Sequence, residues 1–229
     1  MLFPFIFFQK DLEGKIMYCI INDGVIYHMS TVIAVCGVNF CAFISDSRKV
    51  LNSGNSWKVD SDSEQKIFRI NKNLVFGATG LFAMSERILD PFNKFSDMEA
   101  LMIDDAKDAV LEYIDQNKYT ITGCQMRNYL LGGKNHNGQF CIYEIHYNPS
   151  MMDTDVVQRI PEFAGQYAVS LALPRKLCGK ESEYMAKVSD VISSMKTSNE
   201  LFVGITKIIN GIAEVDETVG GDVNAVLIS

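Results

Sequence analysis

Short apolar runs rich in β-branched residues recur along the sequence after residue 30, and polar turns separate them. Runs of this kind, bounded by turn residues, predict strands. The first four runs pair into two hairpins, because only a few polar residues join the members of each pair: 31–36 with 40–45, and 66–70 with 74–78. Later strands are predicted at 128–132, 139–146, 167–173 and 224–228.

Apolar residues recur at helical spacing between residues 81 and 117. Pro91 and the segment 95–97 interrupt this pattern, so it predicts two helices rather than one. Ser96 or Asp97 is a candidate N-cap for the second of them.

A second helical pattern follows residue 180. It predicts helices at about 181–195 and 198–214, with Ser198 as the N-cap of the later one. Strands and helices therefore come in separate blocks. Such an order indicates an α+β fold or a layered sandwich rather than alternating β-α-β units.

The composition is that of one ordinary folded domain of 229 residues, of which 48% are hydrophobic. With 21 Lys+Arg against 28 Asp+Glu, the net charge is −7, the opposite of what phosphate binding requires. No apolar run approaches the roughly 18 residues of a membrane span. Three histidines match no zinc-ligand spacing: His28, His136 and His146. We therefore expect no nucleic acid, membrane, metal or cofactor among the partners.

Six cysteines are present, and none of them forms a Cys-x-x-Cys pair. Most lie within apolar runs, which is typical of buried, reduced thiols in a cytoplasmic protein. They are Cys19, Cys36, Cys41, Cys124, Cys141 and Cys178.

The first 29 residues differ in character from the rest of the chain. Their opening apolar run is short, contains Pro4, lacks a preceding basic segment and has no small-residue cleavage site, so it does not match a signal peptide. Met17 and Met29 lie within the same stretch. Two interpretations stay open: 1–29 is a pro-segment, or it is an extension upstream of the true start. In both, 30–229 is the folded domain.

Three polar features stand at the ends of predicted strands. Ser30-Thr31 begins one strand, Asp46-Ser47-Arg48 ends another, and Lys66 opens a third. Each alone has a structural explanation: a strand start, a solvated turn, or a charge that protects a sheet edge. Gly80 and Gly220-Gly221 likewise fit ordinary turns.

In their order and spacing, however, these features resemble the proteasome β-subunit family, which includes the bacterial HslV-type peptidases. The resemblance covers about residues 30–229. It implies an N-terminal nucleophile hydrolase fold, a four-layer αββα sandwich of two antiparallel sheets flanked by helices. The segments that carry it are STVIAVCGVNFCAFISDSRK, EQKIFRINKNLVFGATG, NYLLGGKNHNGQFCIYEI and DETVGGDVNAVLIS.

The resemblance implies that the first residue of the mature chain is the nucleophile. Counting back from Asp46 makes this residue Ser30, or Thr31 if the register differs by one. A hydroxyl needs a base, and the free α-amino group titrates near pH 8, so it can accept the proton. The positive charge of Lys66 would lower the pKa of that amine, and Asp46 would pair with Lys66.

Three further residues match family positions. The backbone N–H of Gly80 would form the oxyanion hole, since glycine permits a close approach. Asp216 would orient the nucleophile. Ser170 matches a serine that lies beside the nucleophile in the family.

Several positions depart from the family pattern. The residue before the scissile bond is Met29 instead of glycine, the nucleophile is serine instead of threonine, and Val219 replaces a serine. Met29 is consistent with a second route, in which it is the initiator and is trimmed because a small residue follows. Ala78, Phe82 and Phe68 flank the matched positions, and we interpret them as core residues rather than as a substrate pocket.

Three functions follow from the resemblance. The first is a peptidase that cleaves peptides or unfolded proteins, self-assembles into rings and works with a regulatory ATPase. The second is a non-catalytic subunit of such a ring. The third is an amidase of the same fold that acts on a small substrate. Turnover of short peptides and the identity of the mature N-terminus distinguish them.

Overall fold

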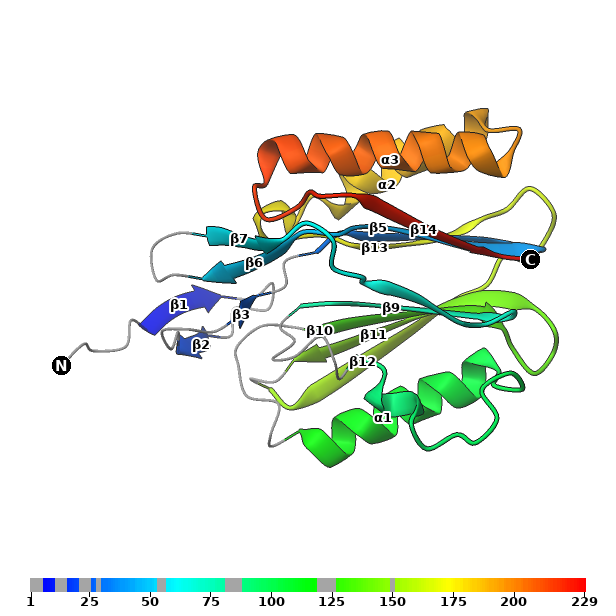
Figure 1. The fold of residues 1–229 in the computed structure, drawn as a ribbon, viewed down its shortest axis with the longest axis horizontal. Coiled ribbons are helices and arrows are strands. Elements are labelled where there is room, and N and C mark those ends of the chain that lie inside the picture. The colour runs from blue at the N-terminus through cyan, green and yellow to red at the C-terminus, as the bar shows by residue number, and fades with distance from the viewer. Residues whose placement is uncertain are drawn as a thin grey trace.

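The computed structural model describes residues 6–10, 16–20, 26–27, 30–52, 57–80, 88–118, 127–148 and 151–229. Two antiparallel sheets dominate it (Figure 1). One has four strands in the order β13-β4-β5-β14: Ala168–Ala172, Val32–Gly37, Phe40–Asp46 and Val223–Ile228. The other has five strands in the order β12-β11-β10-β9-β8: Asp153–Arg159, Phe140–Asn148, Arg127–Lys134, Leu74–Thr79 and Ile67–Asn71.

Two smaller sheets lie at one end of the molecule. A three-stranded sheet has the order β3-β6-β7, with strands Ile26–Tyr27, Lys49–Asn52 and Trp57–Ser61. A separate hairpin pairs β1 (Ile6–Lys10) with β2 (Ile16–Ile20). Both lie beside the two large sheets, at the left of Figure 1.

Side chains alternate across the strands of the four-stranded sheet, as the pleat requires. On β4, Val32 and Ala34 face the core between the two sheets, whereas Ile33 and Val35 face the opposite side. Phe43 on β5 enters the same inter-sheet core, where it meets β9, β10 and β11. Nearly continuous apolar runs in the sequence therefore reflect strands that are buried on both faces.

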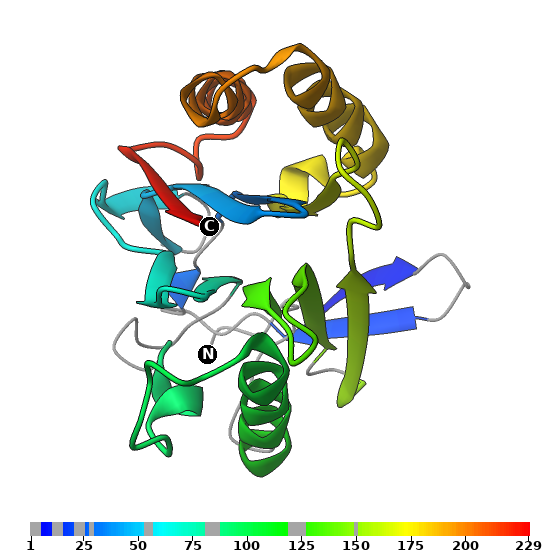
Figure 2. The same cartoon turned by 90° about the vertical axis from the view of Figure 1, so that its right-hand side faces the viewer.

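Helices cover the outer faces of both sheets (Figures 1 and 2). The helices α2 (Glu181–Ser194) and α3 (Ser198–Val215) pack on the four-stranded sheet, with Leu201, Ile205 and Ile209 in the contact. The helix α1 (Ile103–Asn117) packs on the five-stranded sheet. Two short 3-10 helices complete the described elements: η2 (Asp90–Phe92) and η3 (Arg175–Leu177).

The expected α+β sandwich is confirmed, and eight predicted strands are present with bounds that agree within about two residues. Six strands were not predicted: β1, β2 and β3 within the first 29 residues, and β6, β7 and β12. The sequence of β12, DTDVVQR, is polar and mostly exposed, so it lacks the apolar signal of a core strand. It pairs with β11 at the end of the described sheet.

The predictions for the helices need three corrections. The first helix expected after residue 81 is only the 3-10 turn η2 in the described residues, and 81–87 lie outside them. Neither Ser96 nor Asp97 caps α1, which begins after Met102; Asp97 instead accepts hydrogen bonds from Glu99 N and Ala100 N in a turn. The cap of α3 is Thr197 rather than Ser198.

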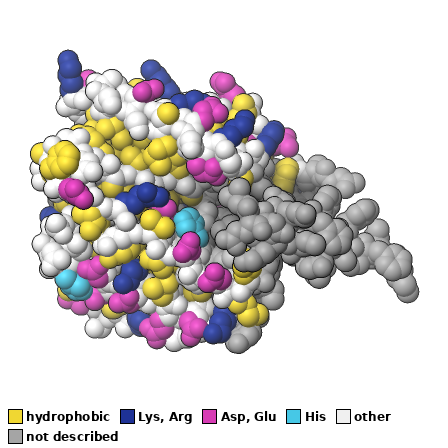
Figure 3. All heavy atoms as spheres, turned by 180° about the vertical axis from the view of Figure 1, so that it is seen from behind, with side chains coloured by type: hydrophobic (Ala, Val, Ile, Leu, Met, Phe, Trp, Pro, Cys, Tyr) yellow, Lys and Arg dark blue, Asp and Glu magenta, His cyan; other side chains and the backbone are white. Residues whose placement is uncertain are grey.

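The surface shows acidic and basic side chains interspersed on the face seen from behind, without a broad basic area (Figure 3). Among the described residues, no helix is long and apolar enough to cross a membrane. Cys36, Cys41 and Cys141 are buried free thiols as expected, but Cys178 is exposed, which corrects that part of the prediction. The side chains of Cys19 and Cys124 lie outside the description.

Candidate active site

A buried ion pair lies where β5 ends and β8 begins. The Lys66 ammonium donates to Asp46 Oδ2 at 2.8 Å, and the side chains of both residues are at most 3% exposed. Lys66 Nζ also donates to the carbonyl oxygen of Arg48 at 2.7 Å. Charges this deeply buried persist only when they are paired and hydrogen-bonded. The sequence-predicted pairing of Asp46 with Lys66 is therefore present in the structure.

The carboxylate of Asp46 is held by backbone amides as well as by Lys66. Its Oδ1 accepts from Thr31 N at 2.8 Å, and its Oδ2 accepts from Arg48 N and Gly220 N, both at 3.2 Å. Three segments far apart in the sequence thus meet at one carboxylate. The bond from Thr31 fixes the start of β4, and with it Ser30, beside the ion pair.

Burial lowers the pKa of Lys66, and the carboxylate of Asp46 opposes this effect. Removing an ammonium from water disfavours its charged form, whereas a neighbouring anion favours it. The result is an amine that gives up its proton more readily than an exposed lysine does. Shifted pKa values of this kind are common at functional sites.

Ser30 and Thr31 are both buried, at 2% and 0% exposure. Ser30 Oγ and Thr31 Oγ1 have no hydrogen-bond partner in the described structure, although buried hydroxyls usually have one. Thr31 uses its backbone N–H and C=O to contact Asp46, which makes it a strand residue tied to its neighbour. Among the described residues, neither hydroxyl is therefore committed to a structural hydrogen bond, and Ser30 differs from Thr31 in that its backbone is not bonded to Asp46.

Gly80 directly follows β9 and has a φ of +105°, a conformation that residues with a side chain rarely adopt. Two residues earlier, Ala78 N donates to the carbonyl oxygen of Lys66 at 3.1 Å. This bond brings the end of β9 to the start of β8. Gly80 and Lys66 therefore lie at the same end of the five-stranded sheet.

Asp216 begins a turn that leads from α3 to β14. Its Oδ1 accepts from Thr218 N at 3.0 Å and from Thr218 Oγ1 at 2.6 Å, while its Oδ2 is buried without a partner in the described structure. The turn continues through Gly220 and Gly221, whose φ values are +153° and +73°. Gly220 N then reaches Asp46, so Asp216 belongs to the same assembly of segments.

Sequence reasoning missed two residues that hold this assembly together. Arg48 donates to Asp62 Oδ1 at 2.7 Å and to the carbonyl oxygen of Glu217 at 3.1 Å, so it links the end of β5 to the late turn. Thr218 is 2% exposed and caps the carboxylate of Asp216. Arg48 belongs to the segment Asp46-Ser47-Arg48, which the sequence analysis had singled out. No pattern in a single sequence indicates the role of Thr218.

Comparisons with solved structures agree with this architecture. Eukaryotic HslV from Trypanosoma brucei matches with a TM-score of 0.52 and 12% identity, over 87% of this chain and 99% of that one. The Anbu complex from Pseudomonas aeruginosa, described as a helical assembly, matches with a TM-score of 0.56 and 15% identity, over 86% of this chain and 80% of that one. The chain has an HslV-like fold. In sequence, no protein-family model and no curated protein matches it.

Within this HslV-like fold, Ser170 does not lie beside Ser30. It faces Ala34 in the register of β13 with β4, four residues along the strand from Ser30. At about 3.3 Å per residue this is a separation of about 13 Å. The interpretation of Ser170 as a catalytic neighbour therefore needs correction, because the regular pairing of β13 leaves it in the inter-sheet core.

Ser170 Oγ has no hydrogen-bond partner in the described structure, and a separate buried polar group surrounds Glu144 on β11. Burial alone would raise the pKa of Glu144, but the hydrogen bonds of its carboxylate with His146 and Arg159 outweigh it and lower the pKa to about 2. Arg159 Nε lies 2.5 Å from Glu144 Oε1, and His146 Nδ1 lies 2.8 Å from Asn128 Oδ1. This group links β10, β11 and β12 structurally.

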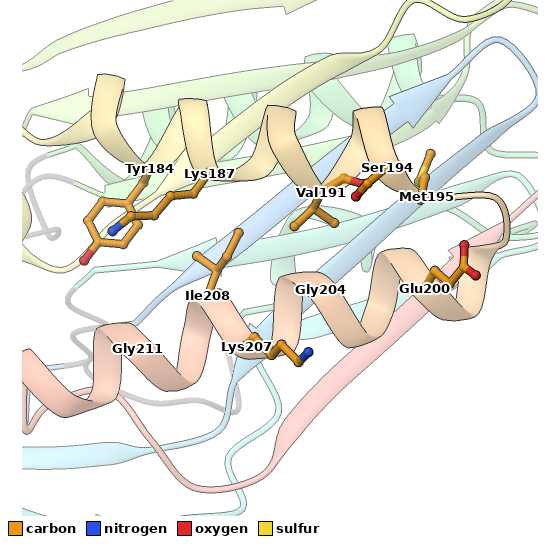
Figure 4. A pocket seen from close by; sticks show the side chains of 10 residues that line it. All are labelled: Tyr184, Lys187, Val191, Ser194, Met195, Glu200, Gly204, Lys207, Ile208 and Gly211. Carbon is orange, nitrogen blue, oxygen red and sulfur yellow. The ribbon is translucent and has the colours of Figure 1, made fainter.

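A groove of about 580 Å³ opens between α2 and α3 (Figure 4). Its lining includes Tyr184, Lys187, Val191 and Lys207, and none of the sequence-predicted site residues. Lys187 is already paired with Glu183 at 2.7 Å.

Ala78 and Phe68 belong to the core that α1 covers, as we interpreted them, whereas Phe82 lies outside the described residues. The described residues contain no cluster of metal-ligating side chains.

Proposed function

We propose that this chain is a peptidase of the N-terminal nucleophile type, with Ser30 as its nucleophile once residues 1–29 are removed. The two packed sheets and their outer helices would be the four-layer αββα sandwich of that class, formed by residues 30–229. One observation carries the proposal: the buried Asp46–Lys66 pair is fixed by hydrogen bonds directly beside the Ser30–Thr31 junction. If Asp46 merely belonged to a solvated turn and Lys66 merely protected a sheet edge, their charges would not need to be buried and paired with each other.

The reaction follows from these groups. The free α-amino group of Ser30 accepts the proton of Ser30 Oγ as the oxygen attacks the substrate carbonyl. The backbone N–H of Gly80 donates to the oxyanion that forms. The same α-amino group returns the proton to the leaving amine, and an ester between Ser30 and the acyl group remains. Water then hydrolyses this ester and regenerates the hydroxyl.

Lys66 and Asp46 act on this step through charge and position. A protonated Lys66 lowers the pKa of the neighbouring α-amino group and favours the alkoxide of Ser30. Asp46 holds Lys66 and, through Thr31 N, the backbone of the nucleophile. Asp216, which belongs to the turn that reaches Asp46 through Gly220, keeps this turn in place.

The test compares two chains. One begins at Met29, so that trimming of the methionine exposes the amine of Ser30, and the other begins at Met1. We expect the first to hydrolyse short fluorogenic peptides and the second to be inactive while residue 29 stays attached. Ser30→Ala should reduce kcat by at least about 10³-fold, because the nucleophile is lost.

Two matched variants decide the register. Ser30→Thr should retain activity, because it keeps the hydroxyl, and Thr31→Val should retain it too, because it keeps the shape and the backbone bond to Asp46. Loss of activity in Thr31→Val but not in Ser30→Ala would move the nucleophile to Thr31. No turnover with a verified free Ser30 would refute the peptidase and favour a non-catalytic subunit, and turnover of small amides alone would favour an amidase.

We also propose that the mature chain self-associates. The Anbu complex with the similar fold is described as a helical assembly. Sedimentation of residues 30–229 would show a species much larger than a monomer if this holds.

A further inference from the structure

The turn end of the β4–β5 hairpin contains two cysteines that face each other. Cys36 on β4 pairs with Cys41 on β5, and the next pair, Gly37 with Phe40, closes the two-residue turn. In a hairpin of this kind the closing pair is hydrogen-bonded, so the adjacent pair is of the non-hydrogen-bonded type. At such positions the Cα atoms are only about 4.5 Å apart and the side chains lie close together.

The two sulfur atoms are in direct contact. The thiol of Cys41 donates to Cys36 Sγ at 2.7 Å, and both residues are fully buried in the core between the sheets. A disulfide bond needs a sulfur separation of about 2.05 Å and a Cα separation of about 4.4–6.8 Å. The sulfurs would have to approach by less than about 1 Å, and the backbone would not have to move.

We propose that Cys36 and Cys41 are a modification site at which a cross-strand disulfide forms, with a small organic disulfide such as oxidised glutathione as the oxidant. One cysteine thiolate attacks the reagent, whose S–S bond breaks, and one reagent thiol leaves. The second cysteine thiolate then attacks the mixed disulfide, the Cys36–Cys41 bond forms, and the second reagent thiol leaves. Two protons and two electrons pass from the cysteines to the reagent.

The order of events follows from burial. Both thiols are free in the closed structure and neither is exposed, so no reagent reaches them there. Burial and the neighbouring Cys36 also raise the pKa of Cys41 well above its ordinary value, which removes the reactive thiolate. The bond therefore forms on the hairpin before the five-stranded sheet covers it. Once the sandwich closes, the same burial protects the bond from reductants.

A bond at this position would fix the register of the hairpin that carries the candidate site. The opposite end of the same two strands holds Thr31 and Asp46, joined by the 2.8 Å hydrogen bond. A slip of one residue would turn every side chain of β5 to the other face of the sheet. The cross-link would exclude that slip, whether or not the chain is a peptidase.

The experiment uses the full chain, refolded from denaturant once with oxidised glutathione and once with a reducing agent. After unfolding in the presence of iodoacetamide, peptide mapping by mass spectrometry identifies which cysteines were protected. We expect Cys36 and Cys41 to be joined after oxidative refolding. We also expect the oxidised protein to have a melting temperature about 5 °C higher, because a short loop is closed in the unfolded chain.

Matched variants identify the pair. Cys141→Ala should leave the cross-link and the melting-temperature difference intact, because the Cys141 side chain lies in the core that α1 covers and its carbonyl oxygen, 3.6 Å from Cys41 Sγ, is kept in the variant. Cys36→Ala and Cys41→Ala should each abolish both. In the already folded, reduced protein, exposed Cys178 should react quickly and the buried pair should not. Alkylation of both Cys36 and Cys41 after oxidative refolding, or a disulfide between any other cysteines, would overturn the proposal.

Discussion

At the scale of single residues, the buried Asp46–Lys66 pair should be sensitive to substitution. Replacing Lys66 with Met would leave the Asp46 carboxylate buried without its cation. Breaking a buried pair from one side costs about 3–5 kcal/mol, so Lys66→Met should lower the free energy of unfolding by that amount in a urea titration. Adding Asp46→Asn should restore part of the loss, because the unpaired charge is then gone.

A surface ion pair provides the control for this prediction. Lys49 and Asp60 are 3.2 Å apart, with side chains 19% and 39% exposed. Lys49→Met should cost less than about 1 kcal/mol, since exposed pairs contribute little. If Lys66→Met costs no more than Lys49→Met, the buried pair does not have the energetic role assigned to it.

The lowered pKa of Glu144 predicts how the stability of the protein depends on pH. Its pKa in the folded protein is lowered to about 2 from an ordinary value of 4.5. A depressed carboxyl pKa gives stability that is complete above about pH 4.5 and is lost as pH falls towards 2; the full amount is about 3 kcal/mol. Urea midpoints measured from pH 5 to pH 2.5 should fall more steeply for the wild type than for Glu144→Gln. Parallel curves for the two proteins would contradict this.

At the scale of elements, α3 illustrates how a helix start is decided by geometry. Thr197 Oγ1 accepts from Glu200 N at 3.2 Å, and the Glu200 side chain accepts from Thr197 N at 3.2 Å, which is a complete capping box. Thr197→Ala should therefore lower the unfolding free energy by about 1 kcal/mol. Ser198→Ala should be nearly neutral. Equal effects in urea titrations of the two variants would mean that the box does not stabilise α3.

The same helix shows what the sequence could and could not predict. Its apolar spacing located it to within a residue, because Leu201, Ile205 and Ile209 all face the core. The choice between adjacent Thr197 and Ser198 could not be made, since both are good N-caps and only the path of the chain decides. Core strands were predictable for the same reason as α3, whereas the polar edge strand β12 was not.

The candidate site was predicted unevenly. Asp46 and Lys66 were identified only because the order and spacing of the polar features resemble a family; each alone fitted a solvated turn or a charged sheet edge. Ser170 was misplaced because only the register of β13 with β4 reveals that it faces Ala34. The roles of Arg48 and Thr218 depend on a turn that returns to Asp46 from more than 150 residues away, so no local pattern contains them.

At the scale of the whole molecule, exposed apolar side chains are distributed unevenly. Seven large hydrophobic residues are exposed in the described structure, and three of them lie on or directly before β12: Met151, Met152 and Val156. Phe163 lies in the segment that follows this strand. The strand β12 pairs with β11 and ends the described five-stranded sheet. Exposed apolar residues along the end of a sheet favour contact with a further chain. We therefore infer that a second copy packs against β12 if the mature chain assembles.

This inference gives the last prediction. Val156 is 39% exposed, so Val156→Lys should leave the melting temperature nearly unchanged while a charge prevents apolar packing at the strand. Analytical ultracentrifugation of residues 30–229 should show the variant shifted to smaller species at equal protein concentration. Val203 is 48% exposed and belongs to α3, which covers the four-stranded sheet rather than the sheet that contains β12, so Val203→Lys should sediment as the wild type does. If Val203→Lys sediments as smaller species and Val156→Lys does not, the assembly contact lies on the outer helices, where the groove of Figure 4 is found, rather than on the edge of the sheet.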